Sequence, residues 1–176
     1  MTAGRFLTVH CSVCSRRIYR PLLAFLMLLG FLCGIFLTVN SDPSSVSLMR
    51  TAALSRVSIV GLLTVLLLPF LLSAFAVYTS STYLLFPVCW LKAFSFGHSA
   101  GMISLAFGNA GWLVRWLLLF SSGLSLPVLI WFCMRHGDGT HRKDLLRDFS
   151  VCMVLVLLIG SLDFRVISPF LVKLIE

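Results

Sequence analysis

The chain has 176 residues, of which 59% are hydrophobic and only 11% are charged, and its formal net charge is +8 at pH 7. Soluble domains carry roughly 25% charged residues, so this composition excludes a water-soluble fold and predicts an integral membrane protein. The length leaves room for one membrane domain of several spans and excludes an added soluble catalytic domain. The basic residues stand in short flanks beside apolar runs, where they set orientation and meet anionic headgroups of the lipid bilayer, so no nucleic-acid partner is expected.

The first apolar run follows a basic stretch. Residues 1–20 carry four arginines and no acidic residue, and they are expected to form a cytoplasmic N-terminal tail. The run 21–39 is longer than the apolar core of a signal peptide and is followed by no Ala-x-Ala cleavage pattern, so we expect a retained span. Gly30 and Gly34 within it form a G-x-x-x-G, which is typical of closely packed membrane helices.

The middle of the chain contains a regular span and an irregular one. After a polar loop, residues 57–78 predict a second span with a kink at Pro69. A third span is expected over 84–107, where Pro87 and Lys92 interrupt the apolar pattern. The pattern leaves open where this segment begins between 83 and 93, and whether it is continuous.

Two further spans complete an all-α bundle of about five transmembrane helices, with residues 21–176 forming a single membrane domain. The fourth span is expected over 112–134 and the fifth over 150–170, on either side of a charged loop. Placing the N-terminus inside the cell and the C-terminus outside puts most basic residues on the cytoplasmic side, as the positive-inside rule requires. The predicted location is therefore the cell membrane, crossed several times. All six cysteines lie in the N-terminal tail or in apolar runs, so no disulfide framework is expected.

The segment from Lys92 to Trp112 differs from every other apolar run, because it mixes a Lys, a His, four glycines and several hydroxyls. Small residues let membrane helices approach closely. Polar groups at membrane depth are costly and by default functional. Lys92 can extend toward the cytoplasmic interface, and His98 fits either an interhelical hydrogen bond or proton or substrate handling. Asp163 in the fifth span can reach across to another helix or lie near the outer interface.

The sequence offers no set of catalytic residues. Asp163 is the only carboxylate inside a predicted span, so an aspartyl dyad is excluded, and neither H-E-x-x-H, G-x-S-x-G nor a phosphate-binding loop occurs. The C-x-x-C of Cys11 and Cys14 fits a reduced, unstructured tail better than a zinc site, which needs four ligands. We therefore expect a protein that is not an enzyme, with no catalytic residue, cofactor or metal.

Several motifs in order resemble the stage II sporulation protein M family, whose members are small membrane proteins of about five helices. The similar positions are Lys92, Gly97, Gly101 and the pair Gly111-Trp112, with Gly30 and Gly34 in the first span and a Ser-Pro ending before Lys173. The similarity covers roughly residues 20–176. The chain departs from the family pattern at Ala93, where a Gly is usual, and in a longer interval before Gly111-Trp112.

The resemblance implies a membrane component of spore formation. Family members act in septal wall thinning and engulfment, as a scaffold that places a peptidoglycan-degrading complex made with sporulation proteins D and P at the sporulation septum. A partner interface, or a homo-oligomer, would then be built from the helix-packing positions Gly30, Gly34, Gly97, Gly101, Gly111 and Trp112. The alternative is a permease-like transporter subunit driven by a separate ATPase, with Lys92 and His98 lining the pathway.

Overall fold

The computed structural model describes residues 3–42, 44–47, 59–79, 81–108, 112–137, 142–167 and 169–170, and this part of the chain is all-helical, as predicted. The long helices are α1 (Ala3–Val39), α3 (Ile59–Tyr78), α4 (Leu85–Phe107), α5 (Trp112–His136) and α6 (Leu145–Leu162). Short turns flank three of them, at η1 (Thr82–Leu84), η2 (Arg142–Asp144) and the π-helical η3 (Asp163–Ile167).

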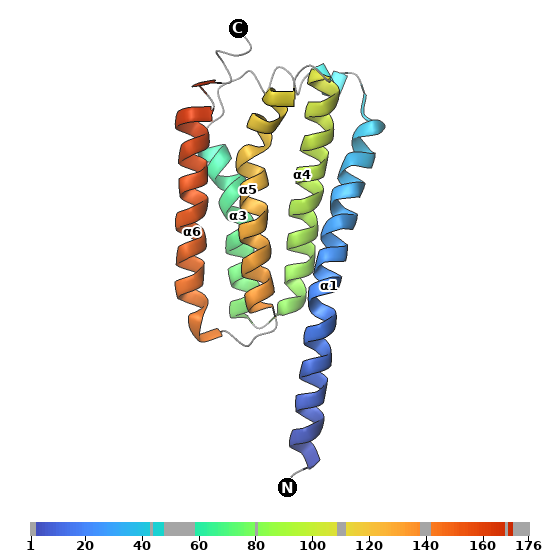
Figure 1. The fold of residues 1–176 in the computed structure, drawn as a ribbon, viewed down its shortest axis with the longest axis vertical. Coiled ribbons are helices and arrows are strands. Elements are labelled where there is room, and N and C mark those ends of the chain that lie inside the picture. The colour runs from blue at the N-terminus through green and yellow to red at the C-terminus, as the bar shows by residue number, and fades with distance from the viewer. Residues whose placement is uncertain are drawn as a thin grey trace.

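The five long helices stand side by side, and each runs opposite to the one before it in the chain (Figure 1). Helices α1, α4 and α6 therefore share one direction, and α3 and α5 run the other way. The N-terminal part of α1 extends beyond the rest of the bundle. Helix α6 ends at the opposite end of the bundle from the start of α1.

Two helix boundaries differ from the predictions, at the starts of α1 and α6, and the open question of the third span is answered by α4. Helix α1 begins at Ala3, so the stretch expected to be a separate unstructured tail is continuous with the first span. Helix α4 is continuous from Leu85, because Pro87 falls in its first turn, where a backbone N–H has no intrahelical acceptor to lose. Helix α6 begins at Leu145 rather than at 150, because its first turn is paired with α5, as described below.

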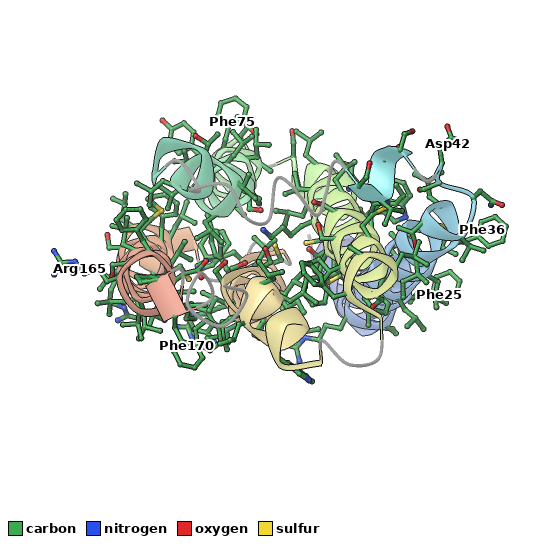
Figure 2. All side chains as sticks on the ribbon, turned by 90° about the horizontal axis from the view of Figure 1, so that it is seen from above. Phe25, Phe36, Asp42, Phe75, Arg165 and Phe170 are labelled. Atoms are coloured by element: carbon green, nitrogen blue, oxygen red, sulfur yellow. The ribbon has the colours of Figure 1, made fainter. Side chains whose placement is uncertain are left out.

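The centre of the bundle is filled by apolar side chains from all five helices. The fully buried ones include Leu23, Phe70, Leu85, Leu129, Phe132 and Val156. The outer faces are apolar as well, and Figure 2 shows Phe25, Phe36 and Phe75 pointing away from the bundle. A protein that is apolar both inside and outside is suited to lipid rather than to water.

Within the residues that the structure describes, three helices are long and apolar enough to cross a membrane. They span Ile18–Val39, Trp116–His136 and Leu145–Ile167. The apolar stretch Leu63–Tyr78 of α3 is shorter, and α4 carries Lys92 together with the small and polar residues that lower its hydropathy. The described chain is thus an all-helical, membrane-embedded protein with three candidate spans.

Candidate functional site

Helices α1 and α4 pack along a row of small residues. Gly30 and Gly34 of α1 are buried and face α4, while Gly97 and Gly101 of α4 face α1. Residue numbers increase in the same direction along both helices at this contact, since Gly30 lies beside Trp90 and Gly34 lies beside Gly97 and His98. The two helices therefore run parallel, and each contributes a G-x-x-x-G to the same contact.

The contact is close enough to exclude a single methyl group. A Cβ on Gly30 would stand 2.7 Å from the Trp90 carbonyl oxygen, and one on Gly34 would stand 2.7 Å from the His98 backbone nitrogen. A Cβ on Gly97 would overlap the Phe31 carbonyl. Backbone atoms cannot move aside as a flexible side chain can, so any larger residue forces the helices apart. The glycines hold α1 to α4 within the chain and are not exposed for another protein.

Lys92 closes a gap in the hydrogen bonding of α3. Pro69 lies inside α3 and has no N–H, so the carbonyl of Val65, four residues earlier, lacks its helical donor. The Lys92 Nζ lies 3.4 Å from that carbonyl oxygen and donates to it. Lys92 is buried, with 6% of its surface exposed, so its ammonium group ends inside the bundle instead of extending outward as expected. The contact ties α4 to α3.

His98 and Asp163 are the other polar positions singled out in the sequence. The His98 ring stacks on Phe94 with 6.3 Å between centroids, and within the described residues its Nδ1 has no hydrogen-bond partner. Asp163 begins the π-helical turn η3 and accepts a hydrogen bond from Ser121 of α5. Asp163 thus follows the end of α6 and reaches across to α5, where its partner is Ser121 rather than His98 or Lys92.

Trp112 is the first residue of α5. Its side chain and the whole of Gly111 lie outside the described residues, so the packing role predicted for the Gly-Trp pair stays a prediction.

A partly buried ionic cluster joins α5 to α6 and was missed in the sequence, where its residues were interpreted as a charged loop. Asp148 Oδ2 lies 2.5 Å from Arg135 Nε and 3.2 Å from His136 Nε2, and Asp148 Oδ1 lies 3.3 Å from Arg147 Nε. His136 and Asp148 are buried, and the Arg135 guanidinium also lies over the Trp131 ring at 5.4 Å. The available signal was basic residues ending one helix and an acidic residue in the first turn of the next, which suit the two helix dipoles.

A group of thiols lies in the core of the bundle, near the end where α4 begins and α5 ends. Cys89 Sγ of α4 lies 3.4 Å from Cys133 Sγ of α5, which in turn lies 3.8 Å from the Ser73 hydroxyl of α3. Tyr19 of α1 reaches the same region, where its hydroxyl is 3.5 Å from the Cys133 carbonyl oxygen. These contacts join four helices, and the cysteines behave here as small buried apolar groups.

The glycine row, the Lys92 contact, the ionic cluster and the thiol group all act between helices. They define a class of protein, a membrane-embedded helical bundle whose small and polar residues connect its own helices. No protein-family model, curated protein or solved structure matches the chain.

Proposed function

We propose that this chain is a non-enzymatic membrane scaffold of five spans, with its N-terminus inside the cell and its C-terminus outside. The alternating directions of the five long helices support this arrangement. It places the basic residues of the N-terminal stretch and those around the ionic cluster on the same, cytoplasmic side, as the positive-inside rule favours.

The proposed role is that of the stage II sporulation protein M family, in which a membrane component positions a peptidoglycan-degrading complex at the septum of a spore-forming cell. The order of Lys92, Gly97 and Gly101 supports this resemblance. The main support for a scaffold is that these same residues connect helices of the chain. The glycines let α4 pack against α1, and Lys92 links α4 to α3. In a permease subunit, the same polar groups would face a path through the protein.

The proposed partner contact differs from the glycine interface that was predicted from the sequence. Because Gly30, Gly34 and Gly97 are buried between α1 and α4 and Gly101 faces Thr38 of α1, we expect a partner's transmembrane segment to bind an outward face. The outer face of α1 offers large apolar side chains, among them Phe25, Leu32 and Phe36, which are 54–70% exposed. Van der Waals packing against these side chains would hold the partner helix.

Deletion of the gene in a spore-forming bacterium that carries it tests this function. Septa are imaged with a membrane dye, and we expect sporulating cells to stop before engulfment. Wild-type protein and the Gly123→Ala variant should restore engulfment, whereas Gly34→Leu should not, because it separates α1 from α4. Normal engulfment in a deletion strain without a related gene would rule out the proposed role.

A further inference from the structure

A groove runs along the outer side of α6, where this helix meets α3. Its volume is about 440 Å³, within the range of small-molecule sites. The wall from α6 includes Val154, Leu157, Leu158 and Phe164, and Leu63 of α3 forms the opposite wall. Arg165 lies at one end. The site is thus apolar along its length, with a single cation at its end.

The position of the groove across the membrane can be inferred from the residues of α6 that line it. Helix α6 belongs to the candidate span Leu145–Ile167. At about 1.5 Å per residue, Arg165 stands about 30 Å from Leu145, the thickness of the hydrocarbon core. If Leu145 lies at one boundary of this core, Arg165 lies at the headgroups of the other. Val154 lies about 16 Å deeper, near the middle of the bilayer. The groove therefore covers the depth of one leaflet.

Among the described residues, no carboxylate pairs with the charge at the end of the groove. Arg165 is exposed, and within the part of the chain that the structure describes it forms no ion pair. Asp163 is two residues away but is turned toward Ser121 of α5. Figure 2 shows Arg165 extending outward from α6, away from the bundle. A guanidinium group in this position suits a phosphate, which it can bind through two parallel N–H···O bonds.

From the depth, the apolar walls and the unpaired guanidinium, we propose that the α3–α6 groove is a binding site for one anionic phospholipid. Its acyl chain lies along Val154, Leu157 and Leu158, and its headgroup phosphate binds Arg165. An anionic headgroup is favoured over a zwitterionic one, because choline brings a second positive charge beside the arginine. This site is independent of the proposed role in spore formation.

Native mass spectrometry of the full chain in detergent tests the site. Phosphatidylglycerol and phosphatidylcholine with identical acyl chains are added at equal concentrations. We expect one phosphatidylglycerol to be retained, with an affinity about tenfold higher than that of phosphatidylcholine, because the choline cation beside Arg165 offsets the phosphate contact that both lipids can make. Arg165→Gln should remove the preference, while Arg20→Gln, which neutralises an exposed arginine near the opposite end of the bundle, should keep it.

A second variant tests the groove itself. Leu158 is 59% exposed, so Leu158→Trp can fill the groove without disturbing the core, and it should lower retention of both lipids. Phosphatidylglycerol should also raise the melting temperature of wild type but not of Arg165→Gln, since a ligand stabilises only the fold that binds it. Equal retention of the two lipids by wild type, or unchanged preference in Arg165→Gln, would overturn the proposal. So would a stable two-chain mass that excludes lipid, because a second copy would then occupy the groove.

Discussion

At the scale of single residues, the chain depends on positions where a side chain is absent. Gly34 and Gly97 let the backbones of α1 and α4 touch, and a Cβ on either would overlap a carbonyl group of the other helix. Gly123 of α5 provides a contrast, since a Cβ there would meet only the Phe96 ring, at 3.7 Å. Glycines of the same helical conformation therefore differ in whether the fold needs them.

The first prediction compares these two kinds of glycine. Gly34→Ala should lower the free energy of unfolding by about 2 kcal/mol, because the added methyl group is overpacked against backbone. Gly123→Ala should leave stability unchanged or raise it by up to about 1 kcal/mol, because alanine favours a helix and the space is open. Thermal unfolding in detergent measures both. Equal stability of the two variants would show that α1 and α4 are not in close contact.

At the scale of elements, polar side chains repair or join helices. Lys92 of α4 supplies the donor that Pro69 removes from α3, so its role depends on the proline. Asp148 of α6 contacts Arg135 and His136 at the end of α5. Both interactions connect neighbouring helices at points where a polar group would otherwise be buried alone.

A double-mutant cycle tests the first of these contacts. Lys92→Met should cost about 1–2 kcal/mol, because it leaves the Val65 carbonyl buried without a donor. In a Pro69→Ala background the helix regains its own N–H, and the same Lys92→Met change should then cost little. The melting temperatures of the four proteins give the coupling energy. Additive effects would mean that Lys92 serves some purpose other than the freed carbonyl.

The ionic cluster gives a further prediction. Asp148→Asn should destabilise the protein by about 3 kcal/mol, since it leaves Arg135 and His136 without their buried carboxylate. Asp144→Asn is the matched control, because the Asp144 side chain is 39% exposed and its ion pairs with Arg135 and Arg147 are 3.9 and 3.5 Å long. Its loss should cost less than about 1 kcal/mol. A similar loss in both variants, measured by thermal unfolding, would contradict a specific role for Asp148.

At the scale of the whole molecule, the five long helices alternate in direction. Helices α1, α5 and α6 are apolar enough to cross a membrane on their own. The segment that carries Lys92, His98, Gly97 and Gly101 is less apolar, yet it is packed between α1, α3 and α5. We expect α4 to span the membrane because its neighbours cover its polar groups, and α3 must then cross as well.

The sequence predicted the helices better than their contacts. Apolar runs and the two G-x-x-x-G patterns indicated an all-α chain with closely packed faces, but a spacing on one helix does not name the helix that it meets. The charges from Arg135 to Asp148 were interpreted as a loop, because a single sequence does not show that Asp148 finds its counter-ions on α5. Lys92 was expected to extend outward, since its acceptor lies 27 residues away on α3.

The most direct test of the five-span arrangement is to determine on which side of the membrane the α3–α4 connection lies. Tyr83 lies in η1 and is 82% exposed. Asp42 follows the end of α1 at Val39, and this end of α1 is at the other end of the bundle (Figure 1). In a variant without native cysteines, Tyr83→Cys and Asp42→Cys are treated with a membrane-impermeant thiol reagent in intact and in permeabilised cells. Five spans with the N-terminus inside predict that Asp42→Cys is labelled in intact cells, and Tyr83→Cys only after permeabilisation. Labelling of both in intact cells would show that only α1, α5 and α6 cross, and it would contradict the account.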